Sequence, residues 1–400
     1  MPDAAEAVLY RVEMPMAVSF DHPAKRRSTS DSLLLRLDVD GASGLGECAP
    51  RAYVTGETTE TVTGALRHVP LDEIFARVRS TEPAVLLARL CHGGVAGTFG
   101  LRGGGNLLCL LETALLDLLG RRLGLGGAEL VPAEGTPAAH RPALPVSQVL
   151  DLSLDVEEFL DTRGPFHFVK VKAADDFARD LRTVTAIRAR LGDTVPVMVD
   201  ANMSWTPDEA HGQLAALRDA GADLVEEPLA KGSWAELARL RARTGLRILL
   251  DESVCTLDDA RTAVESGACD AFNVRVAKNG GPVTAAQLIE LARRAGLGFQ
   301  IGVQVAEVGP LINAGRALAF AHDDAFTVEA GQSDRFFPEP VVSPPPAVCR
   351  TTNTITPAPG PGFGLDLNEH AEPWAVLRRT EGDTSWRPVP APAPRTKEHA

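Results

Sequence analysis

The sequence predicts an α/β protein built as a TIM-type (β/α) barrel, modified at its first units, with an N-terminal α+β capping domain. Three observations predict this fold class. Short apolar runs that end in a polar or charged residue recur eight times in the second part of the chain. Segments with helical spacing separate these runs. The first part of the chain lacks this rhythm.

The N-terminal part alternates like an antiparallel meander over residues 1 to about 60. Here "SLLLRLDVDG" is a strand that runs into an Asp-Gly turn, and "GLGECAPRAYVTGET" follows it. From about 57 to 125 the apolar period becomes helical, as in "NLLCLLETALLDLLGRRLGL". A Gly/Pro/Ala-rich connector comes next. We therefore expect the capping domain to span residues 1–138.

The barrel is expected over residues 139–338. Its eight apolar runs are "ALPVSQV", "FHFVKVK", "TVPVMVD", "ADLVEEP", "RILLDES", "DAFNVRVAK", "GFQIGVQ" and "AFTVEAG". Intervening segments such as "TAAQLIELARRAG" close with Gly, the residue expected just beyond a helix end. Continuous apolar strands that alternate with helices indicate a covered parallel sheet, and eight such strands can close into a barrel.

The C-terminal part is rich in proline. We expect residues 339–375 to pack back on the capping domain. Residues 376–400, which include "RPVPAPAPRTKEHA", are expected to be a disordered tail.

Composition limits the kinds of partner. The 400 residues carry a formal net charge of −13, and arginines are dispersed along the chain, which argues against nucleic acid and membrane partners. The six cysteines show no CxxC spacing, and we see no signal peptide and no apolar stretch of about 18 residues. We expect a cytoplasmic protein with reduced thiols that forms a homo-oligomer and acts on a small-molecule substrate.

Lysine is rare in this chain, with six among 40 basic residues, yet "FVKVKAADD" places Lys170 and Lys172 two apart in an apolar run. Strand alternation puts both side chains on one face. A lysine amine can accept and return a proton, which an arginine cannot do near neutral pH. Lys170 taken alone could equally be a salt-bridged lysine at the edge of the core.

Carboxylates end the next three runs, at Asp200, Glu226 and Asp251. From Lys172 through these acids to Lys278, successive positions are 25 to 28 residues apart, about one strand and one helix. Strand ends of a barrel converge on one mouth, so the acids would need a compensating cation. Three oxygen ligands without His or Cys favour Mg²⁺ over zinc.

This constellation suits removal of a proton α to a carboxylate, because a metal and ammonium groups stabilise the enolate. Lys172 and Lys278 would act on opposite faces of the intermediate, and Lys170 would help to hold the carboxylate charge. Two alternatives are a Schiff-base aldolase that uses Lys278 and a barrel that binds a ligand without turnover. The first leaves the three carboxylates unexplained.

Five motifs carry a resemblance: "KVK" at 170–172, "VDANMSW" at 199–205, "VEEP" at 225–228, "LDES" at 250–253 and "VAKNGG" at 276–281. In this order and spacing they resemble the muconate lactonizing enzyme subgroup of the enolase superfamily. The likeness implies Mg²⁺ ligands at Asp200, Glu226 and Asp251, with Asn202 in support, and an acid/base pair of Lys172 and Lys278. It selects Glu226 over Glu227, which alternation turns away.

The resemblance also bears on the substrate. It implies that the loop with Arg51, Tyr53 and Thr55 closes over the substrate and that Glu307 and Glu329, at the ends of the seventh and eighth runs, read its side chains. Gln304, where no His is found, argues against the mandelate racemase subgroup. Racemisation or epimerisation of an amino-acid derivative or dipeptide is the preferred reaction, with muconate-type cycloisomerisation or dehydration to o-succinylbenzoate as alternatives.

One departure weakens the dipeptide hypothesis. The family's dipeptide epimerases have an Asp-x-Asp pair at the eighth strand end, where this chain has Glu329 followed by Gly331. A substrate without a free α-ammonium group is therefore also compatible with the sequence.

Overall fold

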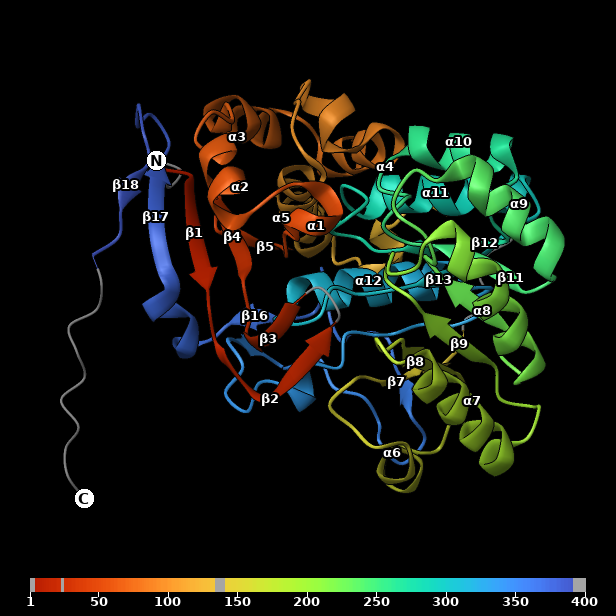
Figure 1. The fold of residues 1–400 in the computed structure, drawn as a ribbon. Helices are drawn as coiled ribbons and strands as arrows, with labels where there is room; N and C mark the ends of the chain where they lie inside the picture. The colour runs from red at the N-terminus through yellow and green to blue at the C-terminus, as the bar shows by residue number, and fades with distance from the viewer. Residues whose placement is uncertain (1–3, 23–24, 134–140, 391–400) are drawn as a thin grey trace, which may run out of the picture.

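The computed structural model describes residues 4–22, 25–133 and 141–390, with no side-chain account for residues 19–22 and 25–27. A five-stranded antiparallel sheet forms the core of the N-terminal domain (Figure 1). Its strands, in spatial order, are β18 (Arg387–Pro388), β17 (Ala375–Thr380), β1 (Glu6–Val12), β4 (Ser32–Val39) and β5 (Ala42–Cys48).

The predicted Asp-Gly turn joins β4 to β5. Val39 pairs with Ala42, and the two residues between them, Asp40 and Gly41, have φ angles of 49° and 76°. Positive φ at both central positions is typical of the turn that connects two-residue β-hairpins. The predicted hairpin is thus confirmed.

The prediction of a disordered tail from residue 376 was wrong for its first part. Strand β17 pairs antiparallel with β1, with Leu377 opposite Leu9, and Leu377 and Trp386 are buried. Two arginines, Arg378 and Arg379, follow Leu377 and hide the strand pattern in the sequence. Arg379 forms an ion pair with Asp72 on α3 (Leu71–Ser80). Residues 391–400 of the predicted tail lie outside the described residues.

Helices of the N-terminal domain pack on one face of this sheet (Figure 1). A Cβ atom at Gly46 would lie 2.1 Å from the carbonyl oxygen of Leu110, so the glycine permits close contact between β5 and α5. A separate hairpin consists of β2 (Pro15–His22) and β3 (Lys25–Thr29). Besides α3, the helices are α1 (Ala52–Thr55), α2 (Thr59–Leu66), α4 (Pro83–Phe99), α5 (Gly105–Leu123) and the 3₁₀ helix η1 (Gly127–Leu130).

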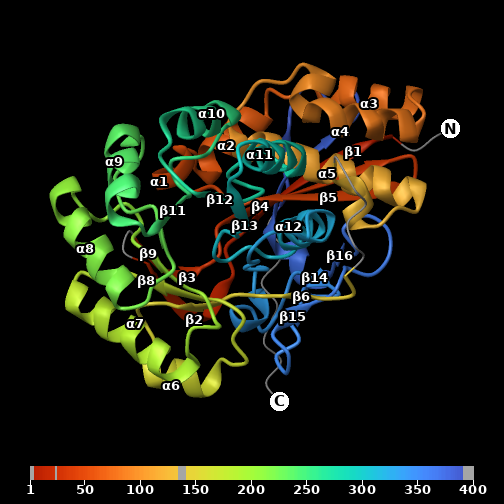
Figure 2. The same ribbon diagram turned by 90° about the vertical axis from the view of Figure 1, so that its right-hand side faces the viewer.

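Seven parallel strands form the second sheet, and helices surround it (Figure 2). The strands are β7 (Gln148–Leu150), β8 (Val169–Lys172), β9 (Val197–Asp200), β10 (Leu224–Glu226), β11 (Arg247–Leu250), β12 (Ala271–Val274) and β13 (Gly298–Ile301). The helices are α6 (Val156–Thr162), α7 (Phe177–Leu191), α8 (Pro207–Asp219), α9 (Trp234–Thr244), α10 (Leu257–Ser266), α11 (Pro282–Arg294) and α12 (Pro310–Ala321).

The eighth predicted run closes this sheet into a barrel. Val328 forms a parallel bridge with Ile301 at the end of β13, and its carbonyl oxygen accepts a bond of 2.9 Å from the backbone N–H of Ser147, next to β7. The run therefore joins the two edges of the sheet, although it is too irregular to count as a strand. The predicted fold class, a TIM-type barrel with a capping domain, is confirmed.

The segment after the barrel contacts the capping domain through α5. The backbone N–H of Phe363 donates to Asp117 Oδ1 at 2.6 Å, and that of Gly362 donates to the carbonyl oxygen of Leu125 at 2.8 Å. The boundaries of the barrel domain at residues 138 and 338 stay a prediction. Short elements here are β6 (Leu144–Pro145), which pairs with β15 (Thr354–Ile355), β14 (Val342–Ser343), which pairs with β16 (Asp366–Leu367), η2 (Ser333–Arg335) and η3 (Glu369–Trp374).

The cysteines and the apolarity of the helices were also considered in the sequence. All six cysteines are free thiols. Within the three described stretches, the structure contains no helix that combines the length and apolarity needed to span a bilayer.

Candidate active site

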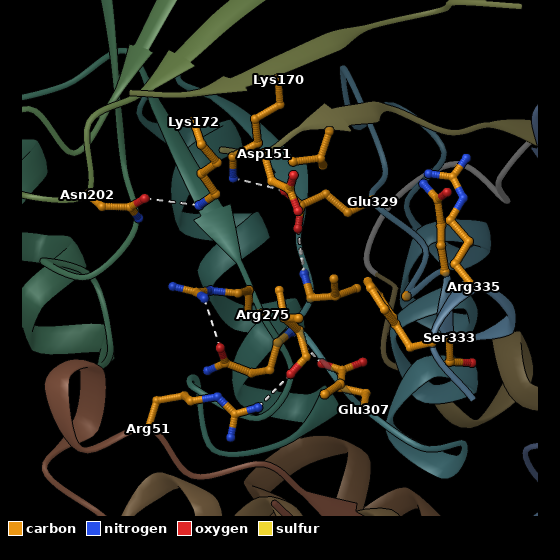
Figure 3. Close-up of a pocket in the computed structure, with 18 of the residues that line it drawn as sticks. Arg51, Asp151, Lys170, Lys172, Asn202, Arg275, Glu307, Glu329, Ser333 and Arg335 are labelled. Carbon is orange, nitrogen blue, oxygen red and sulfur yellow. Dashed lines mark hydrogen bonds and ion pairs between the residues drawn. The ribbon is translucent and has the colours of Figure 1, made fainter. Parts of the chain in front are cut away.

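A cavity of about 270 Å³ lies at the C-terminal ends of the barrel strands (Figure 3). Val18 of the β2–β3 hairpin and Tyr53 of α1 line it from the capping domain. The barrel contributes side chains from several strand ends, so the two domains build the cavity together. The predicted site residues that line it are Arg51, Tyr53, Lys170, Lys172, Asn202, Asp251, Gln304, Glu307 and Glu329.

Lys172 is held at the end of β8 by the neighbouring strand. In the parallel register it lies opposite Asp200, and its Nζ donates to Asp200 Oδ2 at 2.6 Å and to Asn202 Oδ1 at 3.0 Å. Asn202 has a φ of 44°, and its backbone N–H donates to the other Asp200 oxygen at 3.1 Å. Asn202 thus contacts both Lys172 and Asp200, and its predicted support of a metal site stays a prediction.

Lys170, one layer deeper on the same face of β8, is surrounded by carboxylates. Its Nζ lies 2.7 Å from Glu226 Oε2, 2.9 Å from Glu329 Oε1 and 3.1 Å from Asp200 Oδ2. Burial lowers the pKa of Lys170, but these three carboxylates together raise it well above its ordinary value. Lys170 therefore stays charged at neutral pH.

The three predicted acids are buried at the ends of adjacent strands. Asp200 and Glu226 are register partners, and Asp251 follows the last residue of β11. Burial raises the pKa of Asp200, but the ammonium groups of Lys170 and Lys172 outweigh it and lower the pKa to about 2.

The pKa values of the other two acids, Glu226 and Asp251, are shifted in opposite directions. Burial and the charge of Asp200 raise the pKa of Glu226 well above its usual range, against the attraction of Lys170. For Asp251, burial is outweighed by Arg275 and Lys278, which lower the pKa below its usual value. Nearby cations are therefore needed to keep these buried carboxylates ionised.

Glu226 and Glu227 point in opposite directions. Glu226 Oε1 accepts a bond of 2.8 Å from Asn273 Nδ2 inside the barrel. Glu227, with a φ of 38°, instead accepts from the backbone N–H of Asp251 at 2.7 Å and from that of Ser253 at 3.2 Å. Glu227 therefore fixes the loop that carries Asp251, while Glu226 faces the site.

The donor set suits a hard cation. Three carboxylates meet from neighbouring strands, and Glu226 Oε2 and Asp251 Oδ1 make no hydrogen bond; their contacts are ion pairs with Lys170 and Lys278. As the side chains stand, no group of three His, Cys, Asp or Glu in the described parts of the chain is arranged to hold a metal ion. Lysine and arginine groups lie against the carboxylates instead.

The β12 side of the site differs from the sequence prediction. Lys278 Nζ donates to the carbonyl oxygens of Asp251 at 2.6 Å and Asn273 at 2.9 Å, and lies 3.0 Å from Asp251 Oδ1. Its side chain is 0% exposed and does not line the cavity. Arg275 lines the cavity instead; it forms an ion pair with Asp251 and donates to Gln304 Oε1 at 2.9 Å.

The sequence did contain a signal for Arg275. Asn273 points into the barrel toward Glu226, and Arg275 is two residues further along, so alternation directs it to the same side. The pattern is that of Lys170 and Lys172 on β8. The prediction followed the lysine instead of the alternation.

The predicted lid residues have different surroundings. Arg51 Nη1 lies 2.7 Å from Asp31 Oδ1, and Nη2 donates to the carbonyl oxygen of Val305 at 2.6 Å, so it connects the capping loop to the barrel. Tyr53 lines the cavity. The structure does not bring Thr55 there: its hydroxyl accepts from Asn106 Nδ2 of α5 at 3.1 Å.

Glu307 and Glu329, the predicted acids at the ends of the last two runs, both form hydrogen bonds with other residues of the protein. Glu329 Oε2 accepts from the backbone N–H of Val303 at 2.9 Å while Oε1 contacts Lys170. Glu307 Oε1 accepts from the backbone N–H of Gln304 at 2.6 Å. Burial and the charge of Glu47 raise the pKa of Glu307 well above its usual value.

Two arginines that the sequence analysis missed also line the cavity, Arg163 and Arg335. Arg335 Nη2 donates to Gln148 Oε1 at 2.8 Å, and burial together with the charges of Arg350 and Arg163 lowers its pKa to about 10. Within the described residues, neither arginine forms an ion pair with a carboxylate. Other lining residues that were missed are Asp151, Ser333, Glu252, Asn273 and Arg275.

A parallel barrel with buried acids and lysines at its strand ends, beneath a capping domain, defines the class as a barrel enzyme with acid–base chemistry. Residues 151–371 match the family described as Enolase C-terminal domain-like. The chain is 30% identical over 356 residues to muconate cycloisomerase 1 of Pseudomonas putida, which covers 84% of this chain and 89% of that protein.

Two other similarities agree with this family. The chain is 26% identical over 301 residues to L-Ala-D/L-Glu epimerase of Bacillus subtilis (strain 168), covering 74% of this chain and 79% of that protein. The solved structure of muconate lactonizing enzyme from Pseudomonas fluorescens, complexed with muconolactone, matches with a TM-score of 0.75 at 26% identity. That match covers 92% of this chain and 97% of that chain.

The chain therefore belongs to the enolase superfamily, in its muconate lactonizing enzyme subgroup, and is an enzyme. This confirms the family that its five motifs predicted. The similar proteins include epimerases, racemases, a cycloisomerase and a synthase, and enzymes of this superfamily abstract a proton next to a carboxylate and generally use Mg²⁺.

Proposed function

We propose that this enzyme abstracts a proton α to a substrate carboxylate, with Lys172 as the general base and Asp200, Glu226 and Asp251 as ligands of Mg²⁺. The single observation that carries the proposal is the placement of Lys172. It lines the cavity directly beside the acid cluster, 2.6 Å from Asp200. When bound, Mg²⁺ would supply positive charge that stabilises the enolate of the substrate.

The two lysines of β8 have different tasks in this proposal. Lys170 contacts three carboxylates and keeps its proton, so it acts as a fixed positive charge. Lys172 contacts one carboxylate and one amide oxygen and is the more exposed of the two, at 9% against 5% of the side chain. Lys172 is thus the lysine placed to exchange a proton with a substrate.

The cavity also suggests the substrate class. Arg163 and Arg335 line it without a carboxylate partner among the described residues, and a second acidic group on the substrate would satisfy them. Leu154 and Phe336 add apolar surface. We therefore propose a small substrate with two acidic groups and an apolar middle.

A free ammonium group on the substrate is less well matched. Glu329, the acid at the eighth strand end, already contacts Lys170, and Gly331 offers no second carboxylate. This supports an acylated amino acid or a muconate-like dicarboxylate over a dipeptide with a free N-terminus.

An enolate has two fates in such a site. It can be reprotonated on the opposite face, which is racemisation or epimerisation, or it can form or break a bond at the β-carbon, as in cycloisomerisation or dehydration. The sequence favoured the first fate because the loop "PRAYVTGET" resembles that of dipeptide epimerases, and Lys278 was expected to serve the opposite face of the intermediate. Lys278 does not line the cavity and donates to a backbone carbonyl instead, which argues against racemisation or epimerisation.

The test is exchange of the α-proton with D₂O, followed by mass spectrometry, on N-succinyl amino acids, dipeptides and muconolactone. We expect Mg²⁺-dependent exchange with the wild type, loss of exchange with EDTA, and recovery on adding Mg²⁺. Calorimetric titration of Mg²⁺ into the protein without substrate gives an independent readout. Exchange that persists in EDTA, or no exchange with any compound, would contradict the proposal.

A further inference from the structure

We propose that Arg275 occupies the position where a second proton-transfer group would be needed, and that the enzyme therefore moves protons on one face of its substrate only. This inference rests on the proposed function and specifies the outcome of that reaction. It is carried by the geometry of the β12 side of the cavity.

Lys172 and Arg275 reach the cavity from opposite sides of the acid cluster. Three strands, β9, β10 and β11, separate β8 from β12 in the sheet, and they carry Asp200, Glu226 and Asp251. Lys172 contacts the first of these acids and Arg275 contacts the last. Figure 3 shows both side chains entering the cavity from different elements. A group that serves the second face would have to come from the Arg275 side.

Arg275 cannot perform that task near neutral pH. Its guanidinium is paired with Asp251 and bonded to Gln304, which fixes its orientation. A permanently charged guanidinium can stabilise negative charge on an enolate, but it cannot accept the α-proton.

The neighbouring lysine does not replace it. An ammonium group has three protons to donate, and Lys278 Nζ has three oxygen partners within 3.0 Å. Moving it into the cavity would leave two backbone carbonyls and Asp251 without those contacts. Lys170, the other lysine in the cavity lining, is held by three carboxylates on the β8 side.

Glu252 also lines the cavity, but it belongs to the Lys172 side. Its Oε1 accepts a bond of 3.2 Å from Asn202 Nδ2, and Asn202 Oδ1 in turn accepts from Lys172. Glu252 is thus tied through Asn202 to the side chains around Lys172.

One base on one face suffices for reactions at the β-carbon. In an elimination, Lys172 takes the α-proton, the C–H electron pair becomes the Cα=Cβ double bond, and the Cβ–O bond breaks with its electron pair going to the leaving oxygen, as when a lactone opens to a carboxylate. The reverse addition closes a ring when that oxygen belongs to the substrate itself. Cycloisomerisation and elimination are thus the reactions that the site supports, and racemisation is not.

The experiment follows α-proton exchange in D₂O separately for the two configurations at the α-carbon of each probe. The probes are the enantiomers N-succinyl-L- and N-succinyl-D-phenylalanine and the epimers L-Ala-L-Glu and L-Ala-D-Glu. Muconolactone, whose α-carbon is a methylene, is scored by whether one or both of its α-hydrogens exchange. We expect one configuration, or one of the two methylene hydrogens, to exchange at least about 100-fold faster than the other, without interconversion of the configurations. Exchange and interconversion of both configurations, or exchange of both methylene hydrogens, would overturn the assignment of Arg275 while leaving the proposed function standing. No exchange with any probe would overturn the proposed function itself.

Arg275→Lys is the matched variant, because it keeps the positive charge beside Asp251 and adds an amine that can release its proton. We expect it to gain exchange of the opposite enantiomer. Arg275→Met, which has no amine, should not gain it. A folded Arg275→Lys that binds the probe and gains no second-face exchange would show that this position does not serve the second face, and would overturn the inference.

Discussion

The two sides of the acid cluster carry similar sequence patterns but different chemistry. On the β8 side, "KVK" directs two lysines inward, and one of them reaches the cavity beside Asp200. On the β12 side, "RVAK" directs an arginine inward and the lysine away. The strand ends at Val274, and the turn that follows carries Lys278 to the backbone carbonyls. Distance from the strand end therefore decides which basic side chain enters the cavity: Arg275 directly follows β12, whereas Lys278 lies three residues further along.

The largest expected effect is on the β8 side. Lys172→Ala should reduce α-proton exchange by about 10²- to 10⁴-fold, because it removes the general base while Asp200 keeps Lys170 as a partner. Circular dichroism should show an unchanged fold. Exchange within a few-fold of the wild type would remove Lys172 from the mechanism.

The acid between the two basic groups on the β12 side comes next. Asp251→Asn should abolish turnover and weaken Mg²⁺ binding in calorimetry, because one of three anionic ligands is lost. The variant also leaves Arg275 and Lys278 with less negative charge nearby, so its melting temperature should fall. Unchanged Mg²⁺ affinity would show that Asp251 is not a ligand.

Lys278 offers the direct contrast with Lys172. Lys278→Met should lower the free energy of unfolding by about 3 to 5 kcal/mol, since it removes a buried cation that contacts Asp251 and two carbonyl oxygens. Denaturant unfolding measures this loss. Exchange on the Lys172 face should stay within about tenfold of the wild type. A stable variant that has lost exchange would restore Lys278 as an acid/base group.

The smallest effect is expected at the lid. Tyr53→Ala should change the ratio of kcat/KM between two substrates, because Tyr53 lines the cavity. Thr55→Ala is the matched control on the same helix, since its hydroxyl faces Asn106 and α5. We expect that control to leave the ratio unchanged. Equal changes in the two variants would mean that the lid does not distinguish substrates through Tyr53.

The prediction from sequence succeeded where a local pattern and a repeating unit agreed. The regular interval from Lys172 to Asp251 follows from the length of a strand and its helix, and barrel closure then brings those ends together. Glu226 and Glu227 face opposite ways, as alternation predicted, although Glu227 lies just beyond the end of β10 and has a φ of 38°. These features depend only on backbone geometry that the sequence encodes locally.

The sequence alone therefore determined the barrel, the capping domain, the family and the set of acids at the strand ends. Alternation from Asn273 favoured Arg275 on the β12 side, but only the tertiary structure decided that the turn after β12 carries Lys278 away from the cavity. It also decided that β17, whose apolar signal is hidden by arginines, completes the N-terminal sheet from the far end of the chain. Both results arise from contacts between segments distant in sequence, such as Lys278 with Asp251 and Leu377 with Leu9, and no local pattern specifies such contacts.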